Sequence, residues 1–337
     1  MSTIKNNINT YANLTAYNND LNKDFPNVSY IQKTDEVKWY KYDPDHIVAV
    51  YNVTSTDTAT KLLQVNTSIT YQIIDGVRQN TVQMNYTFDT LGEHIVKYKM
   101  NVTYFRQTLF YMCPNLISAV IPETITRIDN ALFYSCSNLT NVVLPKTLTQ
   151  IGDIVFEYCS RLTTISIPNG VTEIRNCFGN SGLTYIDLPN SVTTLNGTFN
   201  NVQSLKRVNS NVDGECNIPD SVTTIGGGAF NGCTGLTSIN IPDSVTTISG
   251  NATFAGNRNL RQITIGSGIT SISNQATANS VNIQSITIKA TTPPTISELT
   301  WQTTTCPIYV PSQSVESYKT TGNWVTYADR IQAIPTT

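Results

Sequence analysis

The sequence has little charge. Charged residues make up 13% of the 337 residues, the formal net charge is -2, and no block of lysine or arginine occurs. Because nucleic-acid binding needs several phosphate contacts from basic side chains, we expect no nucleic-acid partner. Asparagine, threonine, serine and tyrosine fill the places of the missing charges. Such a polar, uncharged composition is common in all-β proteins that work outside a cytoplasm.

Histidine is nearly absent, which bears on catalysis and on metals. The chain has only His46 and His94, and none of its seven cysteines has C-x-x-C spacing. Serine and cysteine nucleophiles need a histidine beside them, and zinc needs clustered ligands, so we expect no enzyme, no metal and no cofactor. A carbohydrate-active enzyme with paired carboxylates is the remaining enzymatic alternative. Its candidate acids are scattered: Asp129, Glu157, Glu173, Asp187, Asp220 and Asp243.

Long apolar runs are also missing. The longest, such as residues 47–51, fall far short of the roughly 20 residues that span a bilayer. The first residues lack the apolar core of a secretory signal. We therefore expect a soluble chain without membrane insertion. It would be truncated, exported without a cleaved leader, or carried outside the cell on a particle.

What the sequence does contain is an internal repeat. A leucine or isoleucine recurs every 21 to 31 residues, and each unit reads approximately L-x-x-I-x-I-P-x-S-V-T-x-I-x-x-x-x-F-x-x-C-x-x-L. The positions that open the units are Leu116, Leu139, Leu162, Leu183, Leu205, Leu236, Leu260 and Ile283.

Three apolar columns keep their register across the units. No coil of about 23 residues can bury these columns alone, so coils must stack and seal one another. The first column is Ile121, Leu144, Ile167, Leu188, Ile218, Ile241 and Ile265. The second is Ile128, Ile151, Ile174, Leu195, Ile225, Ile248 and Ile272, and the third is Phe133, Phe156, Phe178, Phe199, Phe230 and Phe254. The prediction is an all-β solenoid of about seven coils over residues 106–290.

One unit carries a family pattern almost intact. Residues 218–236, IPDSVTTIGGGAFNGCTGL, resemble the BspA-like leucine-rich repeats, which occur on surface proteins of gut and oral Bacteroidetes, in trichomonads and in gut bacteriophage proteins. The resemblance implies a β-rich horseshoe and a role in adhesion or partner binding, and it supplies no catalytic residues. Two departures are an insertion at residues 209–217 and a unit with Gly266 in place of proline and a small residue near Ala278 in place of phenylalanine.

The region before the repeat reads as a separate β-module over residues 41–105. Alternating runs at 46–53, 68–74, 81–88 and 93–102 predict strands, and Asp75-Gly76 predicts a hairpin turn. The stretch YTFDTLGEHIVKYKM is similar to the last hairpin of PKD or immunoglobulin-like sandwiches, which implies a spacer and N-terminal cap. Residues 1–40 form a polar segment, for which we expect a short helix near residues 11–17 and one strand.

Residues 291–337 are expected to form a C-terminal cap. Thr291-Thr292-Pro293-Pro294 is predicted to break the coil, residues 306–311 form a strand, and Ser312 is the expected N-cap of a helix. A solenoid needs such a cap over its open end. The side chains expected to cover the last core ladder are Tyr318, Trp324 and Ile331.

Four cysteines share one repeat column. In stacked coils their side chains point in parallel, which fits a disulfide dihedral poorly, so we expect buried free thiols. These four are Cys113, Cys136, Cys159 and Cys233. The remaining three, Cys177, Cys216 and Cys306, have no role that the sequence predicts.

The outward strand positions are the expected binding face, and most of them are small and neutral. One patch differs beside the 209–217 insertion, where Tyr185, Asp187, Lys206 and Arg207 combine an aromatic ring with cationic donors that suit a sugar or a protein loop. The predicted function is non-enzymatic recognition or display, with a protein or glycan partner and possible homo-oligomers or virion neighbours. The favoured setting is the virion of a gut phage, as a tail, fibre or decoration component. A bacterial or protist cell-surface adhesin is the alternative.

Overall fold

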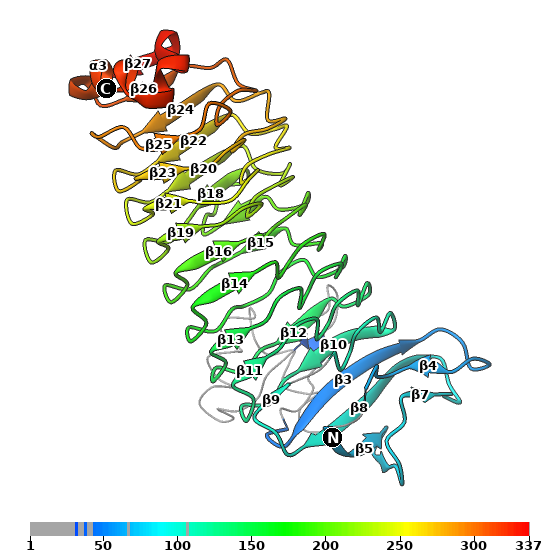
Figure 1. Cartoon of the computed structure of the whole chain (residues 1–337). Coiled ribbons are helices and arrows are strands. Elements are labelled where there is room, and N and C mark those ends of the chain that lie inside the picture. The colour runs from blue at the N-terminus through cyan, green and yellow to red at the C-terminus, as the bar shows by residue number, and fades with distance from the viewer. Residues whose placement is uncertain (1–30, 33–36, 39–42, 66–67, 106–107, 337) are drawn as a thin grey trace, which may run out of the picture.

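The computed structural model describes residues 31–32, 37–38, 43–65, 68–105 and 108–336. The chain is an elongated β-solenoid with a sheet-rich module at the N-terminal end and short helices at the C-terminal end (Figure 1). The all-β solenoid prediction is confirmed. The solenoid has about ten turns, because coils at its ends that depart from the repeat pattern stack on the others. The predicted helix near residues 11–17 lies outside the described residues.

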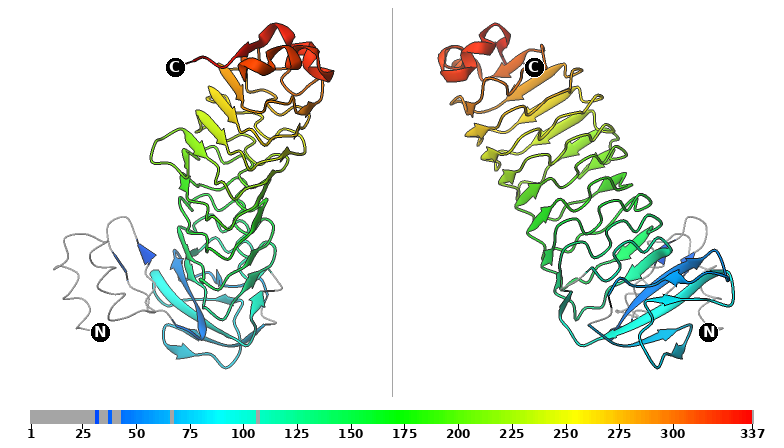
Figure 2. Two further views of the ribbon diagram at one scale, coloured as in Figure 1. Left: turned by 90° about the vertical axis from the view of Figure 1, so that its left-hand side faces the viewer. Right: turned by 45° about the vertical axis from the view of Figure 1, so that its right-hand side comes forward.

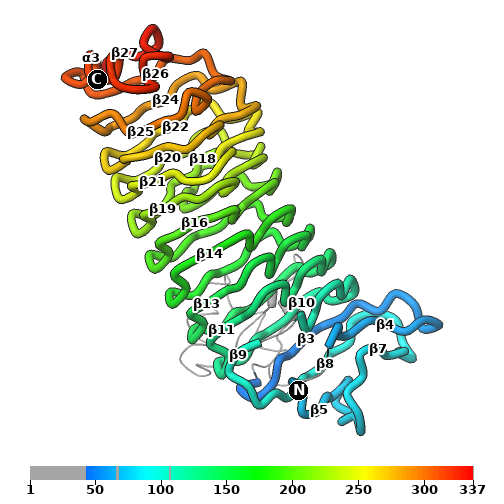
Figure 3. Tube along the Cα trace, in the orientation of Figure 1, coloured from blue at the N-terminus to red at the C-terminus, as the bar shows by residue number. Residues whose placement is uncertain are grey.

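Each coil contributes a strand to one or both of two faces, followed by a run of turns. Face A is the outward side of β10 (Leu116–Val120), β12 (Asn141–Val143), β15 (Tyr185–Ile186), β17 (Arg207–Val208), β18 (Glu215–Asn217), β20 (Ser238–Ile241), β22 (Gln262–Ile265), β24 (Ser285–Ile288), β26 (Ile308–Val310) and β27 (Ile331–Ala333). Face B is the outward side of β9 (Tyr104–Phe105), β11 (Arg127–Ile128), β13 (Gln150–Ile151), β14 (Glu173–Arg175), β16 (Thr194–Asn196), β19 (Thr224–Ile225), β21 (Thr247–Ile248), β23 (Ser271–Ile272) and β25 (Thr295–Ile296). The turns that include and follow the phenylalanine column form the turn face, and Figure 3 shows the three runs repeating coil after coil.

The phenylalanine column forms a continuous aromatic stack through the core. Phe110 and Phe133 are parallel, with ring centroids 5.3 Å apart, and Phe133 and Phe156 follow at 5.5 Å. The stack continues with centroid spacings up to 6.2 Å as far as Phe254, and every ring is buried. Offset or parallel contacts of this kind add to the burial of aromatic surface. The repeat register read from the sequence is therefore confirmed.

Hydroxyl groups explain the S/T-V-T part of the repeat. Ser221 Oγ donates to the carbonyl of Val192 in the preceding coil at 2.7 Å, and Ser244 does the same to Val222. Two threonine columns, the one in S/T-V-T and the one after the leucine that opens each unit, also donate to carbonyls one coil earlier. Thr270, for example, donates to the carbonyl of Thr246. The serine hydroxyls satisfy backbone carbonyls of the preceding coil, whereas the Thr270 hydroxyl is a second donor to Thr246 O, which already accepts from Thr270 N at 2.8 Å. Serine and threonine thus join adjacent coils, a role that the apolar columns do not reveal.

The cysteine column also joins adjacent coils, by hydrogen bonds inside the core. All seven cysteines are free and buried. Cys136 Sγ donates to Phe110 O at 2.9 Å, and Cys159 Sγ to Phe133 O at 3.1 Å. Burial raises the pKa of these thiols, so they act as neutral, weak donors. Cys177 lies one residue before the phenylalanine column, where Val155 and Thr198 stand in adjacent coils.

The N-terminal module closes the first end of the solenoid. Its long strands β3 (His46–Val53), β8 (Gly92–Met100) and β5 (Ile69–Ile74) are antiparallel, and β3 pairs with β10 of the first coil. Tyr98 of β8 lies edge-on to Phe110 at 5.7 Å, so the aromatic stack begins inside the module. The immunoglobulin-like assignment and the domain boundaries stay predictions.

The predicted hairpin at Asp75-Gly76 is present but shorter than expected. Strand β5 turns into β6 (Val77–Arg78), and Asp75 and Gly76 both have positive φ, as a tight hairpin turn requires. Residues 81–88, expected as the return strand, contribute only β7 (Asn85–Tyr86), which pairs with β4 (Thr60–Lys61). In the preceding segment, β1 (Ile31–Gln32) and β2 (Val37–Lys38) pair antiparallel.

The C-terminal region does not break the coil at residues 291–294 as predicted. Strand β25 follows the two prolines and pairs in parallel register with β23, and Trp301 is fully buried after Thr277 in the phenylalanine column. Proline at the start of a short strand removes no ladder bond that this strand needs. The stack therefore continues to β26 and β27.

A helical segment then covers the last coil. It consists of η2 (Ser312–Ser314), α3 (Val315–Thr320) and η3 (Gly322–Arg330). Tyr318 and Trp324 are buried, and their polar atoms donate to the carbonyls of Ala290 and Pro294. Ser312 is not the N-cap, because Pro311 holds that position and no side chain caps the helix.

The 209–217 insertion forms an extra rung on one face only. Strand β18 lies between β17 and β20 on face A, whereas β16 and β19 are direct neighbours on face B. Cys216 takes the inward position between Val208 and Ile239. Gly214 N donates to Lys206 O at 2.7 Å, and a side chain at Gly214 would overlap Thr237. The close approach and the φ of +94° require glycine there.

Candidate binding surface

Tyr185 and Arg207 occupy adjacent rungs of face A. They are direct partners in the parallel register of β15 and β17, so their side chains leave the sheet on the same side. The Arg207 guanidinium lies over the Tyr185 ring, 5.1 Å from its centroid. A cation–π contact of this kind at an exposed site contributes about 0.5–1 kcal/mol. The contact therefore favours this arrangement modestly, and 40% of Tyr185 stays exposed.

Asp213 completes this arrangement from the loop between β17 and β18. Its Oδ1 lies 3.3 Å from Arg207 Nε, and the Asp213 side chain is 66% exposed. Exposed ion pairs contribute little to stability, so a ligand carboxylate can replace Asp213 at low cost. Ser210 Oγ donates to Glu215 at 2.8 Å and accepts from Val212 N, which ties the loop across its base. Figure 2 shows this loop projecting from the side of the stack.

Of the four predicted residues, three lie on face A and one lies at its border. Tyr185 and Arg207 are in contact, and Asp187 is exposed two residues beyond Tyr185 on the same side of the extended chain. Lys206 is exposed but lies at the border of face A, in the column that Thr184 and Thr237 occupy in neighbouring coils. Asp213, Val212 and Glu215 belong to the surface and were not predicted.

The rest of face A is neutral. The other outward positions from β12 to β24 carry serine, threonine, asparagine, glutamine or valine. Asn209 was expected to face a ligand, but its side-chain amide bonds both the N–H and the carbonyl of Leu188 and so extends the ladder. At the first rung, Ser118 and Val120 are buried rather than exposed, and Val120 packs with Val48 of the module.

Both histidines are engaged in the module. His94 is buried, not a surface residue, with Nδ1 2.7 Å from Asp75 Oδ2 and Nε2 2.9 Å from the carbonyl oxygen of Thr90. Each ring nitrogen thus has a nearer partner than the Thr90 hydroxyl, which lies 3.4 Å from Nε2. His46 lies between Asp43 and Tyr71. Within the described ranges, no group of three or more His, Cys, Asp or Glu side chains could hold a metal ion.

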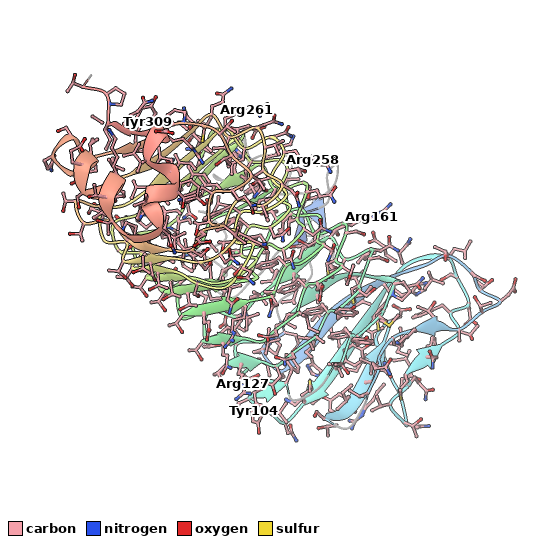
Figure 4. The ribbon with its side chains drawn as sticks, turned by 45° about the horizontal axis from the view of Figure 1, so that its top comes forward. Tyr104, Arg127, Arg161, Arg258, Arg261 and Tyr309 are labelled. Atoms are coloured by element: carbon pink, nitrogen blue, oxygen red, sulfur yellow. The ribbon has the colours of Figure 1, made fainter. Side chains whose placement is uncertain are left out.

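A second tyrosine–arginine pair on face B offers an internal reference. Tyr104 and Arg127 are register partners in β9 and β11, with the guanidinium 6.0 Å from the ring centroid. Arg127 Nε is 2.5 Å from Asp129 Oδ1. Figure 4 shows the two labelled side chains beside each other near the module. This pair has the same chemistry as Tyr185 and Arg207 but no adjoining loop insertion.

Comparison with known families agrees with this architecture. The model of the BspA type leucine rich repeat region matches residues 68–177, 103–213 and 213–306, with six copies. The chain belongs to this family. No curated protein matches the sequence. The matched family is one of repeats and not of catalysts, which agrees with a non-enzymatic binding protein.

Three solved structures are similar to the chain. The leucine rich repeat protein of T. pallidum is 24% identical, covers 55% of this chain and 68% of its own, and has a TM-score of 0.35. A leucine-rich repeat protein from Bacteroides ovatus is 15% identical over 92% of this chain and 98% of its own, with a TM-score of 0.33. A leucine rich cell surface protein from Faecalibacterium prausnitzii is 20% identical, covers 82% and 95%, and has a TM-score of 0.29. These values are too low to transfer a ligand to this chain.

In the part of the chain that the structure describes, none of the helices is long and apolar enough to cross a membrane.

Proposed function

We propose that the chain is a non-enzymatic recognition protein that binds a protein partner through Tyr185, Asp187, Arg207 and the 209–214 loop. The observation that carries the proposal is the contrast between this cluster and the neutral serine, threonine and asparagine of the rest of face A. Stacking alone favours small neutral rungs, so a cluster of charged and aromatic side chains beside an inserted loop serves another purpose.

The chemistry of the cluster favours a protein over a sugar. Tyrosine and arginine are the residues most enriched at binding hot spots, and here they are already stacked on each other. Asp213 pairs with Arg207, and Asp187, Lys206 and Glu215 stand on the same rungs and the adjoining loop, so charges of both signs occur in this region. Complementary charges on a protein loop would fix its orientation and speed association. Val212, 54% exposed near the tip of the loop, adds an apolar contact.

The setting is part of the proposal. Display on the virion of a gut phage is the favoured setting, and a cell surface outside the cytoplasm is the alternative. Mass spectrometry distinguishes the virion from the cell surface. The chain is sought in purified phage particles and among peptides that a protease releases from intact cells. A chain that the protease releases from cells, and that purified particles lack, would exclude the virion.

The double variant Tyr185→Ala, Arg207→Ala tests the binding site. We expect at least about tenfold weaker binding, about 1.4 kcal/mol, with little change in the melting temperature because neither residue is in the core. The measurement is a titration of the labelled full chain on a panel of intact cells, before and after protease treatment of the cell surface.

The matched control is Tyr104→Ala, Arg127→Ala, which removes the same chemistry from face B. It should bind as the parent chain does. Equal binding by parent and Tyr185→Ala, Arg207→Ala would place the site elsewhere. Loss of binding after glycosidase treatment but not after protease treatment would replace the protein partner by a glycan.

A further inference from the structure

The turn face carries a row of tyrosines in its first three coils. Tyr111 and Tyr134 are stacked with centroids 4.9 Å apart and an interplanar angle of 7°. Tyr158 meets Tyr134 at 5.5 Å and 76°, edge against face, and is 43% exposed. Exposed aromatic surface therefore ends in one ring that turns out of the stack. This row lies apart from face A and is not part of the function proposed above.

Tyr158 stands where its backbone disfavours it. Its φ is +60°, a left-handed conformation that costs a bulky residue free energy. The two coils before have Met112 and Ser135 at this position, also with positive φ, the next two have Asn180 and Asn201, and the two after them have Gly232 and Gly256. The left-handed conformation thus belongs to the repeat and does not select tyrosine, and what distinguishes this coil is an exposed ring set edge-on against Tyr134.

The side chains around Tyr158 are polar hydrogen-bonding groups. Burial raises the pKa of Glu157, and the Asn180 side chain, which hydrogen-bonds to it, opposes that rise. Burial raises the pKa of Tyr134, and the nearby Glu157 raises it further, so the carboxylate lies near the rings. Asn201 Nδ2 donates to Asn180 Oδ1 at 2.6 Å, and Asn201 Oδ1 accepts from Gln203 Nε2. Gly179 lacks a side chain that would crowd Glu157.

From this geometry we propose that the Tyr158 edge of the turn face, with Glu157 and Asn180, is a binding site for a neutral glycan. The exposed ring packs against the C–H face of a sugar, while the carboxylate and the amide accept and donate hydrogen bonds to its hydroxyl groups. Glu157 repels sialylated and sulfated sugars, so neutral sugars are selected. The Tyr158 edge offers a single exposed ring, which favours a sugar over a protein partner, and the cation of Lys61 lies at the other end of the row, where it donates to the carbonyl oxygen of Tyr111 at 3.0 Å.

The test uses Tyr158→Asn, which installs the residue of the following coils. The full-length chain is applied to immobilised neutral, sialylated and sulfated oligosaccharides. The parent should bind neutral members, and Tyr158→Asn should reduce that binding at least tenfold while its melting temperature stays the same or rises, because asparagine tolerates the left-handed backbone.

The control is Ile154→Asn in the same coil. Ile154 also has a positive φ, of 54°, and Asn176 holds its position in the next coil. This variant should be as stable as the parent or more so, and it should bind neutral sugars unchanged. A second control, Tyr185→Ala with Arg207→Ala, should leave sugar binding intact, which separates this site from the one on face A.

Three results with oligosaccharides would overturn the proposal. They are a parent chain that binds none of the oligosaccharides, a Tyr158→Asn variant that binds like the parent, and a preference for sialylated or sulfated members. Binding of a protein to this edge that Tyr158→Asn abolishes, without any sugar binding, would also reject the glycan.

Discussion

The first and last coils solve the same packing problem with different chemistry. In the first coils, phenylalanine rings stack and cysteine thiols donate to the carbonyls of the preceding coil. In the last coils, Thr277 and Trp301 continue the phenylalanine column, and the cysteine position passes to Asn257, Ser280 and Thr304. Ser280 Oγ donates to Phe254 O at 2.7 Å, in the place of a thiol.

The difference shows what each column demands. The phenylalanine column holds Trp301 in one coil and the much smaller Thr277 in another, both buried, so it does not require the same volume in every coil. The cysteine column takes a small residue that in most coils is a donor, since thiol, hydroxyl and amide all reach a buried carbonyl. Val202 holds the same position without a donor, and Ser181 Oγ is buried there without a partner, so hydrogen bonding and size both act on this column.

The largest expected effect comes from Phe156→Ala in the middle of the stack. Phe156 is fully buried between Phe133 and Phe178, so the change removes buried surface and leaves a cavity. We expect a loss of about 3–5 kcal/mol in the free energy of unfolding, measured by reversible denaturation. Thr277→Ala, in the same column, is the control and should lose far less. A loss below about 1 kcal/mol for Phe156→Ala would mean that the column does not depend on volume.

A smaller effect is expected at Asn257, where the donor is an amide. Asn257 Nδ2 donates to Phe230 O and Phe254 O at 2.8 and 2.9 Å, while its Oδ1 is buried without a partner. Asn257→Ala leaves the carbonyls with fewer donors and should cost about 2 kcal/mol.

The decisive comparison is Asn257→Cys, which restores the residue of the first coils. It should unfold within about 1 kcal/mol of the parent, since it loses donors but also removes an unpaired buried oxygen. The measurement is chemical denaturation of both variants beside the parent. If cysteine and alanine destabilise equally, the column selects size and not hydrogen bonding.

A further effect is a pH dependence that belongs to the thiol coils. Burial raises the pKa of Cys113 from 9.0 to about 12. The unfolded thiol ionises first, so the contribution is complete below pH 9 and falls as pH rises toward 12, by at most about 1.4 kcal/mol per pH unit. Denaturation at pH 8 and at pH 10.5 should show a smaller decrease for Cys113→Ala than for the parent.

Reaction with a thiol reagent also tests whether the cysteine thiols are buried and protonated. At pH 8 the native chain should not react, and denaturant should expose the thiols, because thiolate is the reactive form. Rapid reaction of the native chain would contradict the buried, protonated column.

The repeat could be predicted from sequence because its columns are apolar and regularly spaced. The extra rung is not predicted by these columns, because Glu215-Cys216-Asn217 lies within the insertion. Its polar–apolar–polar alternation, the same as Ser238-Ile239-Asn240, was the available signal. The C-terminal coil was missed for a related reason, since Pro293 and Pro294 outweighed the match of Ile296 to Ile272.

The candidate site was predicted only in part. Tyr185 and Arg207 differ from their column neighbours, which the sequence displays directly. Asp213 joins them through a loop whose path depends on the close packing of Gly214 against Thr237. The Tyr158 edge depends on a backbone conformation, and a residue's φ is not visible in a repeat alignment that already tolerates asparagine and glycine there.

Strand β18 is, in the terms of crystal physics, an edge dislocation. Face A gains one row that face B lacks, which adds one strand spacing of about 4.7–4.9 Å to a single side of the stack. Such a defect cannot be removed by sliding coils past one another, because every column on both sides of it remains in register. The loop that the extra row creates stands on face A, the side that carries the row. A stacked array can in this way acquire a recognition loop by inserting part of a coil, while its core ladders stay continuous.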